Sequence, residues 1–243
     1  MEPFSISDIY KDVNGDRVID INPLPKNCCN FDCVFCPFGK TKIKTNKRHY
    51  FSDSKNFIKR LEKFLVKNEV DKVYINPEGE ALYNTELPRI IELIKNNECN
   101  IKILSNGYIF NQPEYFILLK EFEEVIGELA AVTEKEFQKL QRPIENYTLE
   151  NYIDNMSKFS KNYKGKFIIA VNILKNYNDS SHKINKLKKI IKGIDPDKIL
   201  LETQDDDRLK DTFAVSNQKL QKIKNEFDFL DCQLKQWFYL THY

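Results

Sequence analysis

The stretch that decides the fold lies near the start of the chain, where residues 25–37 read Pro25-Lys26-Asn27-Cys28-Cys29-Asn30-Phe31-Asp32-Cys33-Val34-Phe35-Cys36-Pro37. Three of its cysteines, Cys29, Cys33 and Cys36, have the spacing C-x3-C-x2-C. Three thiolates on one short loop can hold three irons of a four-iron, four-sulfur ([4Fe-4S]) cluster, which leaves the fourth iron without a protein ligand. The sequence therefore predicts an iron-sulfur centre with one iron open to another molecule.

A structural zinc site is the main alternative use of these cysteines. Such a site needs four ligands, usually as two separated pairs, and the chain has a single Cys-x-x-Cys. Cys28 could supply a fourth thiolate, but adjacent residues rarely point at one metal. Six cysteines in 243 residues without a secretory signal indicate cytosolic thiols, not a disulfide framework. We expect Cys28, Cys99 and Cys232 to be non-ligands, buried as small apolar residues.

Length and composition favour one sizeable α/β domain. A chain of 243 residues with 41% hydrophobic residues can bury most of its apolar surface as a single barrel. The longest apolar-rich run, from Phe167 to Leu174, is too short to span a bilayer, so we expect a cytoplasmic protein with no membrane contact. We expect one domain over residues 1–243, with residues 231–243, which hold the only tryptophan, as a C-terminal tail.

Charge is abundant but balanced. The chain has 38 Lys and Arg against 36 Asp and Glu, which gives no strong electrostatic footprint for nucleic acid, although an RNA substrate is not excluded. A local basic cluster follows the cysteines and consists of Lys40, Lys42, Lys44, Lys47 and Arg48. It is either a solvated loop surface or a means of holding an anionic substrate or a partner protein.

Short apolar stretches alternate with longer amphipathic ones, which is the pattern of βα units around a parallel sheet. Six such units predict an α/β fold, a partial (β/α)6 barrel of the TIM type. Ser54 and Ser216 stand in N-cap-like positions before two of the amphipathic stretches. The predicted strands are 18–22, 72–75, 101–104, 124–131, 167–174 and 198–202, and the predicted helices are 54–68, 85–97, 113–121, 133–140 with 149–160, 180–192 and 216–229.

Two polar turns follow predicted strands, at the end of a barrel where active sites gather. Asn76-Pro77-Glu78-Gly79-Glu80 follows the second strand, and Ser105-Asn106-Gly107 follows the third. The chain contains neither G-x-x-x-x-G-K-[ST] nor G-x-G-x-x-G, so nucleoside triphosphate and dinucleotide sites are poorly supported. Asn106 either contacts a ligand or only tolerates the turn before Gly107.

Taken together, these motifs resemble the radical S-adenosylmethionine (SAM) superfamily. The cysteine spacing with an aromatic residue before the last cysteine is similar to its cluster motif. Gly79-Glu80 is similar to its Gly-Gly-Glu motif, with Glu78 in place of the first glycine. The order of further landmarks resembles the subgroup related to wybutosine-synthesis enzymes, although Glu128-Leu129-Ala130-Ala131 stands where Ser-Leu-Asp-Ala is usual. Those landmarks are Leu24-Pro25-Lys26, Gly39-Lys40-Thr41, Thr133-Glu134-Lys135-Glu136-Phe137, Gln141-Arg142-Pro143 and Asn178-Asp179-Ser180.

The resemblance implies which residues meet the cofactors. It implies a [4Fe-4S] cluster on Cys29, Cys33 and Cys36, with SAM on the open iron. Reductive cleavage of SAM to a 5′-deoxyadenosyl radical would follow, and the radical would take hydrogen from a small molecule, RNA or peptide. A low-potential electron donor of the flavodoxin or ferredoxin type is implied as well. The residues expected at SAM are Phe35 beside the adenine, Gly79, Glu80, Asn106 and, facing the ribose from inside the barrel or lying at the strand edge, Asn172.

Two other functions stay open at this point. One is an activase that installs a glycyl radical on a partner protein, which a compact barrel with an open active site would suit. The other is a noncatalytic iron-sulfur protein used for electron transfer. The remaining cysteines are too few and too scattered for a second cluster, which speaks against relatives that use one. No residue stands out as the catalytic partner of a substrate radical.

Overall fold

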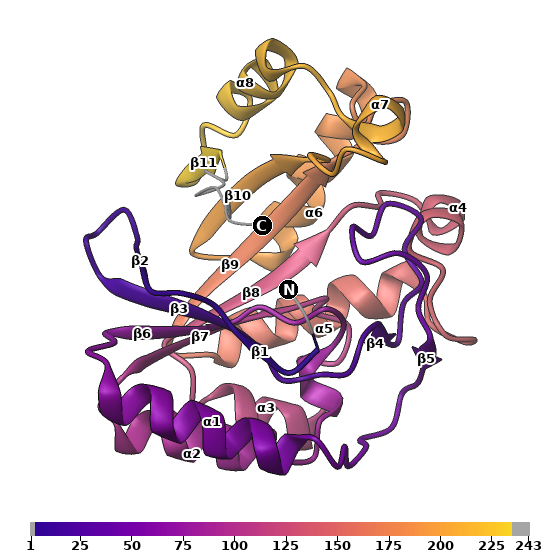
Figure 1. Cartoon of the computed structure of the whole chain (residues 1–243). Helices are drawn as coiled ribbons and strands as arrows, with labels where there is room; N and C mark the ends of the chain where they lie inside the picture. The colour runs from indigo at the N-terminus through magenta and orange to yellow at the C-terminus, as the bar shows by residue number, and fades with distance from the viewer. Residues whose placement is uncertain (1–2, 235–243) are drawn as a thin grey trace.

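The computed structural model describes residues 3–234. Its central element is a sheet of nine strands (Figure 1). Its strands run in the order β1-β3-β6-β7-β8-β9-β10-β11, with β2 also paired to β3. Neighbours from β3 to β11 are parallel, while β1 and β2 lie antiparallel to β3. The bounds are β1 Ser5–Ile6, β2 Tyr10–Lys11, β3 Arg17–Asn22, β6 Lys72–Ile75, β7 Asn100–Ser105, β8 Glu124–Leu129, β9 Lys166–Ile173, β10 Lys198–Thr203 and β11 Cys232–Leu234.

Helices connect the parallel strands and cover one face of the sheet (Figure 1). Each long helix has a stripe of buried apolar residues spaced three or four apart, such as Phe57, Leu61 and Leu65 in α1. Two caps are clear, since Thr148 and Ser216 accept from backbone N–H groups in the first turns of α5 and α8. The helices are α1 Ser54–Lys67, α2 Leu87–Asn96, α3 Pro113–Leu119, α4 Glu134–Glu136, α5 Leu149–Asn162, α6 Ser181–Ile194, α7 Lys210–Phe213 and α8 Asn217–Asn225, with a 3-10 turn η1 Ala81–Tyr83 and a π turn η2 Phe137–Gln141.

The six predicted strands correspond to β3, β6, β7, β8, β9 and β10, so the prediction of an α/β fold with a parallel sheet is confirmed. Within residues 3–234 the sheet is open, because no strand pair joins β1 to β11. The N-cap prediction for Ser54 was wrong. Asp53 precedes the helix, while Ser54 is its first residue and is buried, where its hydroxyl accepts from Asn84. Of the predicted tail, Cys232–Leu234 forms β11, and residues 235–243 lie outside the described range.

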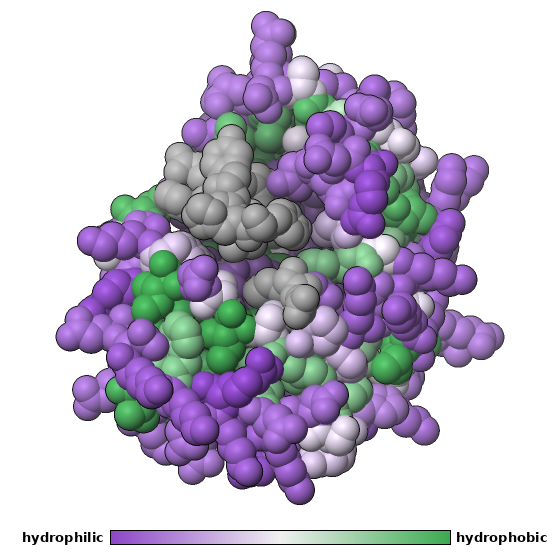
Figure 2. Space-filling model, in the orientation of Figure 1, coloured by the Kyte–Doolittle hydropathy of each residue, from purple (hydrophilic) through white to green (hydrophobic). Residues whose placement is uncertain are grey.

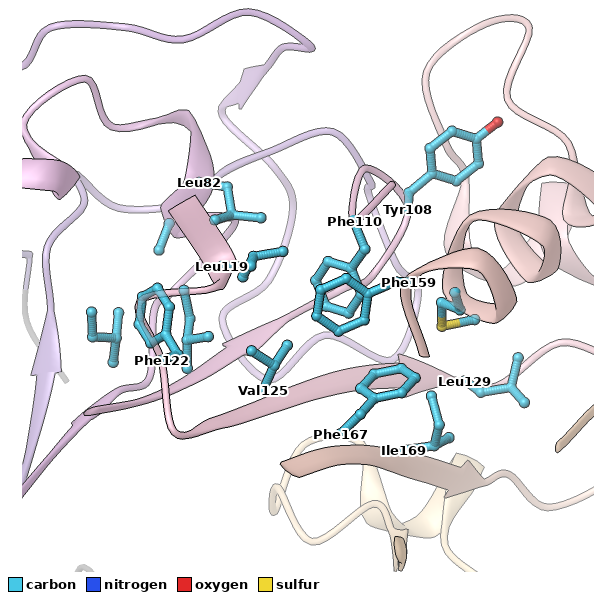
Figure 3. Close-up of a cluster of buried hydrophobic side chains, with 14 of the residues drawn as sticks. Leu82, Tyr108, Phe110, Leu119, Phe122, Val125, Leu129, Phe159, Phe167 and Ile169 are labelled. Carbon is cyan, nitrogen blue, oxygen red and sulfur yellow. The ribbon is translucent and has the colours of Figure 1, made fainter. Parts of the chain in front are cut away.

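The main core lies between the sheet and its helices. Around β8 and β9 it is largely aromatic (Figure 3). The Phe159 ring lies 4.8 Å from Phe110 and 5.1 Å from Phe167, centroid to centroid, which is the favourable range for ring pairs. Gly127 of β8 makes room for these rings, since a Cβ there would stand 3.1 Å from Phe110. This rigid layer fixes the strands whose carboxyl ends carry the polar residues described below.

The opposite face of the sheet changes character along the strands. Near the amino ends it carries ion pairs, with Lys72 to Asp12 and Asp16, and Lys102 to Glu124. Its middle is a small apolar layer, and its carboxyl ends are polar. The apolar layer consists of Tyr74, Leu104, Ile126, Ile168, Ala170 and Leu200. The polar carboxyl ends are therefore the place where this face can receive a ligand.

Among the described residues no helix is long and apolar enough to cross a membrane. The face of the molecule in Figure 2 is mostly hydrophilic, with apolar patches scattered among charged side chains.

Candidate functional site

The cysteine loop lies over the carboxyl ends of the strands and is tied to the body through its backbone. Val34 N–H donates to the carbonyl of Leu140 at 2.8 Å, and Asp32 N–H donates to that of Gln141 at 3.1 Å. These acceptors belong to η2, which ends at Arg142 in a left-handed conformation. The sequence motif Gln141-Arg142-Pro143 therefore lies at the turn to which the backbone of the cysteine loop is hydrogen-bonded.

A second tie joins the cysteine loop to the turn after β6. Glu80 N–H donates to the Cys28 carbonyl at 2.8 Å, and Cys28 and Gly79 form a parallel bridge. The two backbones are so close that a Cβ at Gly79 would stand 2.0 Å from the Cys28 oxygen. Glycine is therefore required at position 79 by the close approach of the cysteine loop.

Glu80 organises the turns that follow β6 and β7. It is fully buried, and its carboxylate accepts from the Ser105 hydroxyl at 2.8 Å, from Asn106 N–H at 3.1 Å and from Leu82 N–H at 3.2 Å. Burial raises the pKa of this carboxyl to about 7, although the three donors act in the opposite direction. Glu80 is not among the residues that line the cavity described below, so its side chain acts on the two turns.

Asn106 links these turns to the first cysteine of the motif. Its side-chain amide lies 2.6 Å from Asn30 Oδ1, to which it donates, and 3.7 Å from Cys29 Sγ. Phe31 N–H also points at that sulfur, at 3.4 Å. Cys29 Sγ therefore has two N–H groups beside it, and such donors stabilise negative charge on a ligating thiolate and raise the potential of a cluster that it holds.

A cavity of about 1040 Å³ opens between the cysteine loop and the carboxyl ends of β6 to β10. Cys29, Cys33 and Cys36 all line it, as do Asn106 and Asn172. Since single ligand pockets span roughly 300–1,000 Å³, this volume has room for more than one small molecule. The remaining polar lining comes from Asn27, Thr41, Asn76, Glu78, Ser105, Glu128, Glu202, Thr203, Gln204, Asp205, Asp206, Asp207 and Arg208.

The buried environment of Cys29, Cys33 and Cys36 disfavours the thiolate form of their side chains. Burial raises the pKa of Cys36 to about 11. Burial also raises the pKa of Cys29, with a further contribution from Glu80, and that of Cys33, where the two neighbouring motif cysteines contribute. Three thiolates side by side therefore need a positive group among them, and the irons of a cluster would supply one. The donor set and the cavity fit such a cluster.

No three His, Cys, Asp or Glu side chains in the described range are gathered to hold a single metal ion. A four-iron cluster requires a different arrangement of ligands. Each thiolate binds its own iron, so the three sulfurs need not converge on one point. Cys28, Cys99 and Cys232 do not line the cavity. Cys28 and Cys99 are buried, and Cys232 is half-buried in β11.

Of the other residues predicted at SAM, Phe35, Gly79 and Asn172 lie around the same cavity, whereas Glu80 does not line it. Phe35 is 7% exposed and lines it, as does Gly79. Asn172 stands near the end of β9, and its side-chain amide donates to Glu202 Oε1 of β10 at 2.7 Å. The structure thus brings Phe35, Gly79, Asn106 and Asn172 to one cavity.

The sequence did not predict that the segment after β10 contacts the cysteine loop. Gln204 donates from its side chain to the Phe35 carbonyl at 2.6 Å, and Arg208 donates to the Pro37 carbonyl while pairing with Asp206. These contacts span about 170 positions of the chain, and no spacing rule reports them. The only sequence signal was the dense polar run from Gln204 to Arg208 directly after a predicted strand.

Comparison with known proteins decides the family. The model of the radical SAM superfamily matches residues 24–187, which include the cysteine loop and strands β6 to β9. The chain belongs to the radical SAM superfamily. It is therefore an enzyme of a group whose members typically bind a [4Fe-4S] cluster and SAM.

Relatives of similar sequence exist in distant organisms. The chain is 26% identical over 190 residues to UPF0026 protein MJ1312 of Methanocaldococcus jannaschii, covering 77% of this chain and 59% of that protein. It is 27% identical over 194 residues to a UPF0026 protein of Helicobacter pylori, covering 77% of this chain and 61% of that one. The chain thus spans about three fifths of the length of these relatives.

Solved structures agree on the fold. A structure of TYW1 with a lysine-pyruvate adduct bound superimposes with a TM-score of 0.65 at 16% identity, covering 88% of this chain and 74% of that one. A radical SAM methyltransferase from Sphaerobacter thermophilus gives a TM-score of 0.65 at 13% identity, covering 93% of this chain and 72% of that one. At these identities the likeness concerns the fold, and a subgroup similar to TYW1 is compatible with it.

Proposed function

We propose that the protein holds a [4Fe-4S] cluster on Cys29, Cys33 and Cys36 and binds SAM beside it in the same cavity. The observation that carries the proposal is the meeting of these three cysteines with Asn106 and Asn172 around one cavity at the carboxyl ends of the strands. When bound, the cluster and SAM together would supply a carbon radical that removes a hydrogen atom from a substrate.

The residues of the chain have supporting roles in this proposal. The Asn106 amide and the Phe31 N–H hold the Cys29 sulfur in place. The apolar layer that includes Leu104 and Ile126 lies below the cavity on the same face of the sheet, where it would limit the entry of water. Asn172 and Glu202 present polar atoms to whatever binds in the cavity, and their mutual hydrogen bond fixes both side chains.

The cavity wall favours a small substrate over a phosphate backbone. Carboxylates line it at Glu128 and Glu202, and the exposed Asp205 and Asp207 stand at the same wall, where Arg208 is the basic residue. A polyphosphate chain would be repelled by this arrangement. We therefore propose a small molecule or a peptide side chain as the substrate.

Anaerobic reconstitution with iron and sulfide tests the metal assignment. The parent protein is expected to bind about four irons, and Ala at Cys29, Cys33 or Cys36 is expected to abolish the cluster. The control variants Cys99→Ala and Cys28→Ala should keep it. Iron retained by Cys29→Ala but lost by Cys28→Ala would show that the assigned ligand set is wrong.

Substrate tests separate the remaining functions. Release of 5′-deoxyadenosine that rises with a small molecule or peptide supports the proposal. A glycyl radical on a partner protein, seen by electron paramagnetic resonance, would favour the activase instead. An intact cluster with no SAM cleavage would favour the third function, a noncatalytic electron-transfer protein.

A further inference from the structure

The basic cluster after the cysteines has no role in the proposed chemistry, although it is attached to the cysteine loop. Strand β5, Ile43–Lys44, pairs parallel with β4, Cys28–Cys29. Thr45 N–H also donates to the Cys29 carbonyl at 3.1 Å. Residues 40–48, here called the basic segment, are therefore bonded directly to a cysteine assigned to the cluster.

The basic segment is strongly and uniformly charged. Residues 33–52 hold five Lys and Arg and no Asp or Glu, whereas the whole chain has a net charge of only +2. Lys40, Lys42, Lys44 and Lys47 are exposed, and the ion pairs within residues 3–234 include none of them. Four solvated lysines beside one another repel, and an acidic surface would relieve that repulsion.

These lysines do not face the cavity. Gly39 and Thr41 line it, but none of the four lysines does, so their charge is available on the outside of the molecule. Ile43 lies among them and is 39% exposed, which adds an apolar contact of the kind found at protein interfaces. In Figure 1 β5 runs along the right flank, and Figure 2 shows mostly hydrophilic residues there.

We propose that the basic segment is the docking surface for an acidic, low-potential electron-transfer protein. This inference rests on the proposed function, because reduction of the cluster needs one electron from outside the cavity. In that step the donor, a flavin or iron-sulfur protein, would lose one electron and the cluster held by Cys29, Cys33 and Cys36 would gain it, with no bond formed. The basic segment has a positive charge that would attract an acidic donor, and it is hydrogen-bonded to the backbone of Cys29.

The same lysines suit RNA less well. The wall of the neighbouring cavity is acidic through Asp205 and Asp207, so a phosphate backbone held at the lysines would meet repulsion on the way in. A donor protein needs only to approach the outer side of the cysteine loop. Weak redox encounters also use small interfaces, for which a segment of this size is sufficient.

The test compares protein-driven with small-molecule reduction of the reconstituted holoenzyme. Cluster reduction by reduced flavodoxin and by photoreduced 5-deazariboflavin, which is uncharged, is followed by absorbance. The variant Lys42→Glu/Lys44→Glu/Lys47→Glu should slow reduction by flavodoxin about tenfold or more at low salt, because steering by opposite charge is lost. Reduction by deazariboflavin and iron content should be unchanged.

Two controls make the outcome specific. Lys59→Glu/Lys63→Glu reverses exposed lysines on α1, and it should leave the flavodoxin rate close to that of the parent. Raising salt from about 0.01 M to about 0.5 M, which shortens the screening length from ~30 Å to a few Å, should remove most of the difference between parent and triple variant.

Several outcomes would overturn the proposal. One is an equal flavodoxin rate for the triple variant and the parent. Another is equal slowing with deazariboflavin at unchanged iron content, which would mean that the lysines act on the cluster itself and not on a donor protein. A third is a triple variant that loses affinity for an RNA oligonucleotide but is still reduced normally. SAM cleavage driven by deazariboflavin tests the proposed function separately, so the two failures can be told apart.

Discussion

Replacing Gly79 by alanine tests the contact that joins the cysteine loop to the strand ends. The added Cβ would stand 2.0 Å from the Cys28 oxygen and 2.8 Å from its carbonyl carbon, both backbone atoms that cannot rotate away. Ordinary contact begins near 3.4 Å, so the cysteine loop would have to retreat by more than an ångström. The Glu80 N–H···O=C bond to Cys28, 2.8 Å long, would then break.

These contacts give the expected loss in the free energy of unfolding for Gly79→Ala. Overpacking costs about 1–3 kcal/mol and one lost hydrogen bond about 1 kcal/mol, so Gly79→Ala should lower the free energy of unfolding by about 2–4 kcal/mol. The loop that moves carries the cysteines, so iron content after reconstitution should also fall. Denaturant unfolding and iron analysis of the same preparation measure both effects.

Gly193 provides a matched control for this substitution. It lies in α6, and a Cβ there would meet nothing within 4 Å. Gly193→Ala should therefore raise stability by up to about 1 kcal/mol, because alanine restricts the unfolded chain and favours helix. A Gly79→Ala protein with the stability and iron content of the parent would refute the reasoning.

Three further predictions concern the residues that support the site. Asn106→Ala should keep the iron but shift the cluster potential to more negative values in a redox titration, because Cys29 Sγ loses a nearby donor; an unchanged potential would contradict this. Burial raises the Glu80 pKa from 4.5 to about 7, so the folded state holds the proton more tightly, and stability should fall as pH rises through that interval by up to about 3 kcal/mol. Unfolding of Glu80→Gln at pH 5 and pH 8 should lack that difference, and an equal slope in both proteins would count against it. Asn178→Ala should lose about 3 kcal/mol in a denaturant titration, since the buried amide bonds Leu174 N–H and the carbonyls of Ala130 and Asn172; a loss under about 1 kcal/mol would contradict this role.

Strand positions could be predicted from the sequence because each strand buries an apolar face. Val73 and Ile75 in β6 point into the main core, and their spacing of two is visible without a structure. The predicted range 72–75 agrees with β6, while 216–229 overran α8, which ends at Asn225. Periodicity reports which residues are buried, but it reports less well where a helix stops.

The contacts that build the site were harder to predict because they join distant backbone groups. The bond from Gln204 to the Phe35 carbonyl depends on β10 and the cysteine loop ending at the same edge of the sheet. The pairing of β4 with β5 depends on two-residue strands that carry no hydrophobic pattern. The cysteine spacing was informative because thiolate chemistry, not burial, fixes it.

Electron paramagnetic resonance of the reduced, reconstituted protein with and without SAM tests the central claim most directly. If SAM binds in the cavity that Cys29, Cys33 and Cys36 line, its addition should change the spectrum of the reduced cluster, and 5′-deoxyadenosine should form slowly even without substrate. A cluster with about four irons whose spectrum ignores saturating SAM, with no 5′-deoxyadenosine formed, would contradict the account.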